Sequence, residues 1–418
     1  ELAQEKNRKQ WESLEPMNPH SAAHYGSYVF KPISVLNSLD GGVNDITGNV
    51  LKLEGHIQNE IVYSEASQSI SISKFGKLKA SILLQYVLPL VLIFLSFSSV
   101  GNEKKYGRIK LLILQGVSIQ KIIISKSISI WIYGVFLLIV TLLIQSISFF
   151  NLESIQRSIL LLFIYGFYYY IISFLTTYFS AIMKNTTTVL SSILVIWIMW
   201  TFFIPRIWGN TVEKIYTLPS RHAFKEVMNE ERSKGIDGHN PYDKRREELK
   251  HKLLTEYKVD SLSQLPINFD GIIMQADEEY GNLVWDKHFG NKYSIFKKQK
   301  QLYQLSGILN PFASLQSLSM GICGSDMLHH LDFIQKAENY RRYLIKMLND
   351  KHAYGGSKTG DWGWKVDSDF FKSVEDFHYK MPQIFDQINY YMIDIVCLIL
   401  WIVFITLIIK KYTKENIF

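Results

Sequence analysis

Residues 158–183 read SILLLFIYGFYYYIISFLTTYFSAIM, and residues 186–205 read TTTVLSSILVIWIMWTFFIP. Neither run contains Asp, Glu, Lys or Arg. An α-helix rises about 1.5 Å per residue, so roughly 20 residues cross a bilayer core about 30 Å thick. Both runs are long enough, and only Lys184 and Asn185 separate them. The pair predicts two membrane-spanning helices joined by a tight turn.

Three more runs of the same kind occur outside this pair. They are Ala80–Val100, Ser127–Phe150 and Gln387–Ile409, and Asp394 is the only formal charge in the five runs. Several uncharged runs of this length are not typical of the core helices of a soluble domain. We therefore expect an all-α polytopic membrane protein with spans at 80–100, 127–150, 158–183, 186–205 and 387–409.

The positions of Lys and Arg predict the orientation of these spans. Residues 101–126 carry six basic side chains against Glu103 alone, Lys184 lies in the tight turn, and the tail 410–418 is also basic. The long segments 1–79 and 206–386 are almost balanced in charge. Short cytoplasmic loops retain positive charge. The net charge of +7 is therefore a sign of topology, and no nucleic-acid partner is expected.

Residues 1–79 are then expected outside the membrane, with the chain entering it through the first visible span. A chain that starts outside needs an upstream helix or a cleaved signal peptide to carry it there. We expect a further span before Glu1, which gives a six-helix transmembrane domain with both termini in the cytoplasm.

The two long polar segments are expected to form extracytoplasmic lobes. Residues 1–79 begin with a helical stretch to about Glu15 and continue as loops and short elements, with a strand-like alternation at Ser69–Ser73. Residues 206–386 are expected to be mainly helical, over Met274–Leu305, over Met327–Leu348 and in two stretches of Glu226–Tyr257. Two cysteines do not indicate a disulfide framework.

The sequence contains no nucleotide-binding loop of the form Gly-x-x-x-x-Gly-Lys-[Ser/Thr]. The chain is therefore not expected to be an enzyme or to bind a cofactor, and any ATP is expected on another chain. The segment Gly101–Ser118, GNEKKYGRIKLLILQGVS, is a basic and apolar stretch bounded by glycines. It suits a short helix at the membrane surface or in the groove of a partner, or an ordinary interfacial linker.

This segment resembles the signature of ABC-2-type permeases. Glu103, Gly107, Leu111–Leu112, Gly116 and Lys126 stand at matching positions, whereas Arg108-Ile109 replaces the usual Thr-Leu. Further stretches resemble a bacterial subgroup with two large extracytoplasmic insertions: Asn18–Gly26, Phe30–Pro32, Leu53–Asn59, Asn310–Pro311 and Gly324–Phe333.

The resemblance implies a permease pair, identical or related, bound to two cytoplasmic ABC ATPase subunits that hold ATP and Mg²⁺. It places the chain in the bacterial inner membrane and implies a coupling helix at 103–118. It also implies export of a substrate or its extraction from the membrane. Membrane lipid and periplasmic or outer-membrane proteins are further expected partners. The residues implied in coupling are Glu103, Lys105, Gly107, Leu111, Leu112 and Gly116.

Three residues within the spans are candidates for a substrate path. Tyr168 and Tyr169 lie near the middle of the third visible span, and an acid within a membrane, such as Asp394, suggests function because it is expensive to bury. Packing between helices, or a polar contact at the interface, is the alternative for each.

Histidines offer the only metal candidates. His20 and His24 are four residues apart and would share one face of a helix, with His56 as a third ligand. Pro19 and Gly26 leave little room for such a helix, so hydrogen bonding is the favoured interpretation and no metal site is expected. Two other functions stay open: a membrane-anchored receptor or assembly scaffold with a protein-binding lobe, and a membrane-embedded metallohydrolase.

Overall fold

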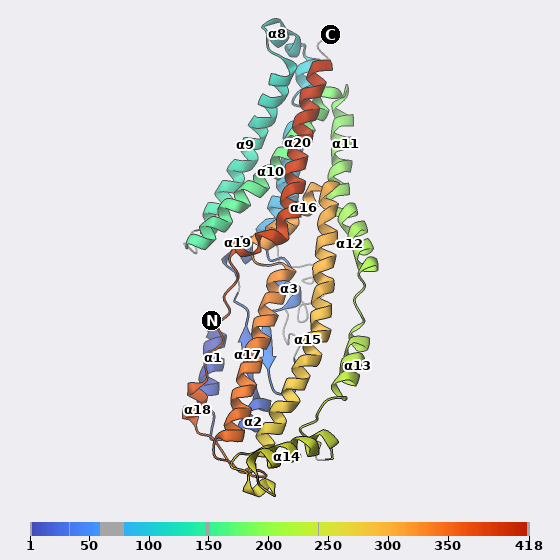
Figure 1. Cartoon of the computed structure of the whole chain (residues 1–418). Coiled ribbons are helices and arrows are strands. Elements are labelled where there is room, and N and C mark those ends of the chain that lie inside the picture. Colours follow the sequence, from blue (N-terminus) through green and yellow to red (C-terminus); the bar gives the residue numbers. More distant parts are fainter. Residues whose placement is uncertain (1, 33, 59–78, 147–150, 241, 416–418) are drawn as a thin grey trace.

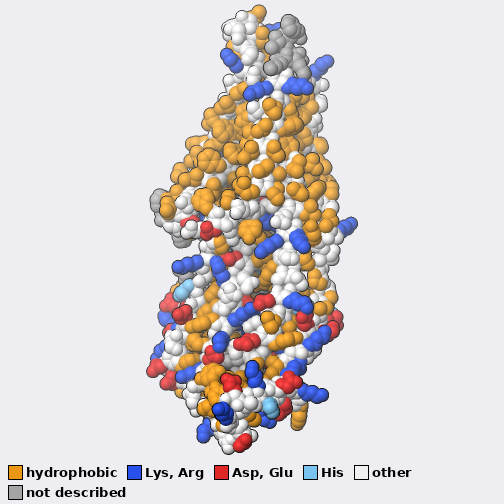
Figure 2. Space-filling model, in the orientation of Figure 1, with side chains coloured by type: hydrophobic (Ala, Val, Ile, Leu, Met, Phe, Trp, Pro, Cys, Tyr) orange, Lys and Arg blue, Asp and Glu red, His pale blue; other side chains and the backbone are white. Residues whose placement is uncertain are grey.

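The computed structural model describes residues 2–32, 34–58, 79–146, 151–240 and 242–415. They form an elongated molecule of two parts placed end to end (Figure 1). The membrane part contains the apolar helices and has α8 and the C-terminus at its far end. The lobe contains the described residues of 2–58 and 221–383. Figure 2 shows hydrophobic side chains over the membrane part and interspersed acidic and basic side chains over the lobe.

Five helical stretches of the described chain are long and apolar enough to cross a membrane. They are Ala80–Lys105, Ile119–Gln145, Leu152–Ile182, Thr186–Ile215 and Ile384–Lys411. Since helices predominate throughout, the predicted fold class of an all-α polytopic membrane protein is confirmed. The elements of this part are α5 (Ala80–Ile82), η3 (Leu83–Val87), α6 (Leu88–Ser96), α7 (Gly101–Lys105), α8 (Arg108–Leu114), α9 (Ile119–Ser146), α10 (Leu152–Ile182), α11 (Thr186–Ile198), η4 (Met199–Phe203), α12 (Ile204–Ile215), α19 (Ile384–Gln387), η7 (Ile388–Tyr391) and α20 (Met392–Glu415).

Two spans contain a π-helical turn, and each turn is followed by a proline. The turn η3 precedes Pro89, and η4 precedes Pro205. Proline lacks the backbone N–H that an α-helix requires, and its ring clashes with the carbonyl one turn earlier. A wider π-helical turn relieves both problems. The fourth span therefore continues through Pro205 to Ile215, beyond the end expected from the sequence.

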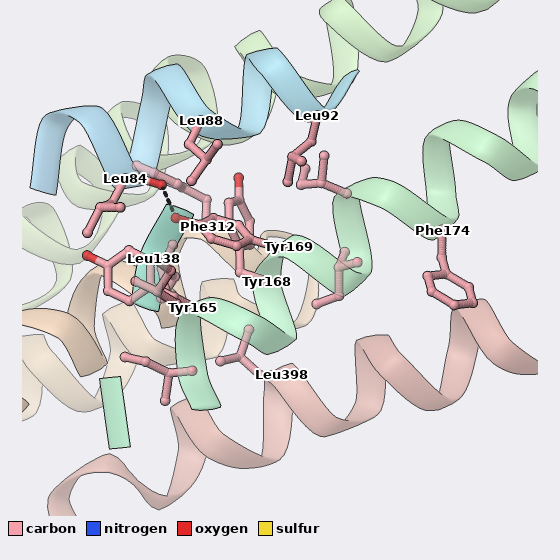
Figure 3. Packing of buried hydrophobic residues seen from close by; sticks show 14 of the residues in the cluster. Leu84, Leu88, Leu92, Leu138, Tyr165, Tyr168, Tyr169, Phe174, Phe312 and Leu398 are labelled. Carbon is pink, nitrogen blue, oxygen red and sulfur yellow. Dashed lines mark hydrogen bonds between the residues drawn. The ribbon is translucent and has the colours of Figure 1, made fainter. Parts of the chain in front are cut away.

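The helix α10 is the centre of the membrane part. It contacts α6, α9, α11, α16 and α20. In its most apolar stretch 61% of the residues are buried, against 28–44% in the other spans. Figure 3 shows Tyr168 and Tyr169 of α10 among the packed side chains of this core. The other spans expose many apolar side chains, as expected of helices that face lipid.

The lobe combines the two polar segments of the chain. Its elements are α1 (Leu2–Glu12), α2 (Pro19–Tyr25), β1 (Ser27–Phe30), η1 (Val35–Ser38), α3 (Asn44–Thr47), β2 (Val50–Leu53), α13 (Arg221–Arg232), α14 (Lys244–Tyr257), η5 (Leu262–Gln264), α15 (Phe269–Gln304), η6 (Leu305–Ile308), α16 (Pro311–Ile322), α17 (Met327–Tyr354) and α18 (Ser368–Ser373). The strands pair antiparallel, from Ser27 opposite Leu53 to Phe30 opposite Val50. The strand-like stretch 69–73 lies outside the described residues.

The first segment packs against the end of the second. The ring of Trp11 in α1 lies 5.4 Å from that of Phe371 in α18, and its indole N–H donates to the carbonyl of Phe371. Met17 and Val366 exchange backbone hydrogen bonds. Both side chains of the aromatic pair are buried. The two segments that the sequence suggested as separate insertions therefore form one lobe with shared cores.

Buried polar contacts join the lobe to the membrane part. Arg157 of α10 donates to the carbonyl oxygens of Ile322 at 2.7 Å and Pro382 at 2.8 Å. Gln85 of η3 donates to the Asp40 carboxylate at 3.2 Å and to the Tyr165 hydroxyl at 2.9 Å. Buried polar networks of this kind fix a single arrangement of the elements that they join. The lobe and α10 are therefore held together by buried hydrogen bonds.

Candidate functional site

The segment that links the first two spans forms two short helices. α7 ends at Lys105, Gly107 has φ 72° and ψ 1°, and α8 runs from Arg108 to Leu114. Gly107 adopts the left-handed conformation that favours glycine. The single helix expected over 103–118 is therefore not present in the structure, because this glycine turns the chain in its middle. Gly116, with φ 84°, ends the second helix.

Glu103 holds the two short helices to the next span. Its carboxylate lies 2.7 Å from Arg108 Nε of α8 and 3.2 Å from Lys126 Nζ of α9. The Ser180 hydroxyl near the end of α10 accepts the backbone N–H of Gly101 at 3.1 Å, and Lys104 donates to the carbonyl of Ala181. The segment Gly101–Leu114, called the coupling segment because it contains residues predicted for coupling, therefore contacts both α9 and α10.

The two faces of α8 differ in exposure. Ile109 is 6% exposed and Leu112 packs against the membrane core, whereas Leu111 is 61% and Leu114 84% exposed. Residues three apart share a face of a helix. Of the two leucines predicted for coupling, Leu111 is thus exposed and Leu112 anchors the helix. Lys105 is exposed.

The candidates for a substrate path are buried in side-chain packing. Tyr168 lies 6.2 Å from Phe312, centroid to centroid, and Tyr169 donates to the Leu84 carbonyl at 2.9 Å. Asp394 accepts hydrogen bonds from Gln304 at 2.6 Å and Ser317 at 2.7 Å. These contacts bind α20 to α15 and α16. A substrate path along the three residues stays a prediction.

The histidines lie far from the membrane, in the lobe. The structure contradicts the argument that Pro19 and Gly26 exclude a helix: α2 runs from Pro19 to Tyr25, Pro19 occupies its first turn, and the side chain of Asn18 caps it. Proline is tolerated there because the first-turn N–H has no helical partner. His20 and His24 therefore do share a face, with Nε2 atoms 3.1 Å apart.

His56 and a fourth histidine complete this group. Potential ligand nitrogens of His20, His24, His56 and His239 all lie within 4.8 Å of one another. His239 was not predicted, because it lies in the loop between α13 and α14 and no sequence spacing connects it to the others. A His between Gly238 and Asn240 was the only available signal.

Asp243 shapes the loop that carries His239. It caps α14, where its carboxylate accepts the N–H of Arg245 at 2.9 Å and the N–H of Asp237 at 3.0 Å. We expect Asp243→Ala to destabilise this loop and helix by about 1 kcal/mol, the usual cost of losing a cap. Hydrogen exchange over residues 237–257 measures the change. Glu247→Ala, in the same helix but 60% exposed, is the matched control and is expected to leave exchange unchanged.

The effect of Asp243 depends on pH. The hydrogen bond with the Arg245 side chain lowers the pKa of Asp243 to about 2, below the value of about 3.9 in an unfolded chain. A carboxylate with a lowered pKa stabilises the fold above the unfolded value, and the contribution is lost as the pH falls towards 2. The difference between wild type and D243A is therefore expected to shrink between pH 4 and pH 2. An unchanged difference at low pH would contradict this role.

The five long apolar helices define a polytopic membrane protein. Residues 22–222 match the family model described as ABC-2 family transporter protein. This match supports the resemblance to ABC-2-type permeases that the motifs around Glu103 indicated. Residues 221–380 match a domain of unknown function, DUF3526, which corresponds to most of the second lobe segment. No curated protein and no solved structure matches the chain.

Proposed function

We propose that this permease belongs to a bacterial inner-membrane ABC transporter and works with separate cytoplasmic ATPase subunits that bind ATP and Mg²⁺. The observation that carries the proposal is the coupling segment at the end of the molecule opposite the lobe (Figure 1). There α8 is held by Glu103 and exposes Leu111 and Leu114. Exposed apolar side chains on a short helix suit the groove of a partner protein.

The charge distribution supports a cytoplasmic location for this end. Basic side chains gather near α8, at Lys104, Lys105, Lys110 and Lys121, and short basic loops stay in the cytoplasm. The lobe then lies on the outer side, in the periplasm, where it offers a surface to periplasmic or outer-membrane proteins. A second permease chain, identical or related, completes the transmembrane domain.

The contacts suggest how ATP hydrolysis moves the permease. Closure of the ATPase subunits displaces α7 and α8 together, because Glu103 joins them. Lys126 passes the displacement to α9 and Ser180 passes it to α10. At the other end of α10, Arg157 moves α16 and the chain before α19. The tilt of the spans exports a substrate or extracts it from the membrane.

Charged substitutions on α8 test this proposal. The double variant Leu111→Glu and Leu114→Glu is expected to weaken ATPase binding at least tenfold, because burying one leucine contributes about 1.5–3 kcal/mol. Titration of the purified ATPase on permease in lipid nanodiscs measures the affinity. Leu283→Glu, at a 67% exposed position of the lobe, is the control. Equal affinities for the two variants would refute docking through α8.

A second candidate function is a membrane-anchored receptor or assembly scaffold. It is favoured by a hollow in the lobe lined by Phe289, Tyr293 and Leu331, which suits an apolar group of another molecule. Under this alternative no ATPase co-purifies with the wild-type chain, and substitutions in α8 leave binding by the lobe unchanged. Co-purification with an ATPase separates the two functions.

A further inference from the structure

Four histidines from three separate segments converge on one point of the lobe. His20 and His24 come from α2, His56 follows β2, and His239 lies between α13 and α14. Within the described ranges, no other group of three or more His, Cys, Asp or Glu side chains meets the same distance criterion. None of the four takes part in the proposed coupling.

The distances between the nitrogens suit a shared cation. Two imidazole nitrogens that bind one tetrahedral Zn²⁺ at about 2.0–2.1 Å lie about 3.3–3.4 Å apart. His20 Nε2 and His24 Nε2 are 3.1 Å apart, and the longest separation in the group is at most 4.8 Å. Side-chain rotations of His24 and His239, which are exposed, are sufficient to close the remaining gaps.

A buried carboxylate orients His56 towards the group. His56 Nδ1 lies 3.0 Å from Asp277 Oδ2, and Asp277 also pairs with Arg232. The other nitrogen, Nε2, is buried and has no hydrogen-bond partner among the described residues. A carboxylate that accepts from one nitrogen of a histidine fixes the tautomer and leaves the other nitrogen free for a metal.

The backbone at His56 is also unusual. His56 has φ 62°, in the left-handed region that costs a residue with a side chain free energy. Its N–H donates to the carboxylate of Glu278, which is buried. A strained residue persists when its surroundings hold it in place, and such residues concentrate at functional sites.

The surroundings lower the pKa of three of these histidines, His20, His24 and His239. Burial, followed by the nearby His56, His24 and His239, lowers the pKa of His20 to about 3. Burial and His56 also lower the pKa of His24 and of His239. A lowered pKa favours the neutral imidazole, which is the form that binds a metal.

We propose that His20, His24, His56 and His239 form a binding site for one transition-metal dication, with Zn²⁺ as the ion that fits best. Imidazole ligands suit Zn²⁺, Cu²⁺ and Ni²⁺, whereas Mg²⁺ and Ca²⁺ require oxygen ligands. Four converging imidazoles can supply the tetrahedral shell of four ligands that structural zinc sites have.

The four-histidine group has the ligand number of a structural zinc site, in which the metal stabilises the fold. Four protein ligands fill a tetrahedral shell and leave no position for a reacting water, so the geometry does not support the metallohydrolase considered from the sequence. The ion would bind α2 and the end of β2 to the loop between α13 and α14. It would thus join the first polar segment to the second. This inference is independent of the coupling to an ATPase.

Metal titration of the full chain tests the proposal. The protein is purified in detergent with an affinity tag that lacks histidine, stripped with a chelator and titrated with Zn²⁺ alone. We expect about one Zn²⁺ per chain by elemental analysis and a rise in Tm of about 5 °C or more at saturating metal. Co²⁺ is expected to give the intense visible absorption of a tetrahedral centre. Absence of stoichiometric metal in wild type would overturn the site.

Variants at the exposed ligands separate binding from folding. The double variant His24→Ala and His239→Ala removes two solvent-exposed side chains and is expected to fold, lose the Co²⁺ spectrum and bind Zn²⁺ at least 100-fold more weakly. Asp277→Asn is expected to weaken binding about 10–100-fold through the orientation of His56. His222→Ala, whose side chain is 83% exposed, is the control and retains wild-type binding. Wild-type affinity in the double variant would also overturn the site.

Discussion

Arg341→Met is expected to reduce the stability of the lobe by about 3–5 kcal/mol, the usual cost of breaking a buried ion pair from one side. Arg341 is 1% exposed. It lies 2.9 Å from the carboxylate of Glu278 in α15 and 2.8 Å from that of Glu338 in α17. It also donates to Asn282 at 2.8 Å. Methionine leaves two buried carboxylates without their main cation.

Thermal unfolding of the purified chain measures this loss. For a lobe of this size we expect Tm to fall by roughly 6–20 °C, with faster hydrogen exchange in α15 and α17. Adding Glu278→Gln and Glu338→Gln to the same chain is expected to restore part of the stability, because both unpaired charges are removed.

The neighbouring arginine provides the matched control. Arg342 pairs with Asp286, which is 54% exposed, and with Glu338. Arg342 is 24% exposed and one of its two partners is largely in solvent, and screened ion pairs contribute little, so Arg342→Met is expected to cost less than Arg341→Met. Equal losses in the two variants would show that the burial of the Arg341 network does not determine its contribution.

Glu103→Gln is expected to reduce transport-linked ATP hydrolysis at least tenfold while leaving the stability of the chain within about 1 kcal/mol of wild type. Its partners Arg108 and Lys126 are 56% and 42% exposed, so the two ion pairs contribute little to folding. They do, however, join α7, α8 and α9. Without them α8 is held to the membrane core by Ile109 and Leu112 but has lost its link to α9, so under the proposed coupling less of the work of the ATPase is transmitted.

ATP hydrolysis by the complex in proteoliposomes, compared with binding of the ATPase to the same permease, measures the coupling. Glu103→Gln is expected to keep ATPase binding and lose stimulation by the permease. The double variant Arg108→Gln and Lys126→Gln removes the same two pairs and is expected to have the same effect. Glu230→Gln, which breaks an exposed pair with Lys234 in the lobe, is the control. Normal coupling in Glu103→Gln would contradict the transmission route.

The segment between the first two spans was expected to form one helix over 103–118, and it forms two short helices. Glu103, Gly107 and Gly116 marked it in the sequence, because a charged and glycine-bounded stretch between two apolar runs is a local signal. The break at Gly107 and the inward position of Leu112 were not predictable in the same way. The sequence does not tell whether a glycine adopts a left-handed or a helical backbone. Only packing against the core distinguishes Leu112 from Leu111.

The group of four histidines was only partly predictable from the sequence. The sequence shows two possible ligands four residues apart, and Pro19 suggests that no helix joins them. In the structure Pro19 occupies the first turn of α2, where proline is favoured. The only sequence signal for His239 was its place between Gly238 and Asn240. The approach of Asp277 to His56 joins residues 221 positions apart, and no local pattern encodes that contact.

The sequence by itself determined the membrane class, the five apolar spans and the resemblance to ABC-2-type permeases, because the length of an apolar run and a short charged motif are properties of neighbouring residues. Tertiary structure decided that the two polar segments form one lobe, that Arg341 is enclosed by two carboxylates and that four histidines meet. Those outcomes depend on how α2, α15 and α17 pack. The burial of a side chain and the convergence of several side chains depend on residues far apart in the sequence. The periodicity of neighbouring residues therefore does not predict them.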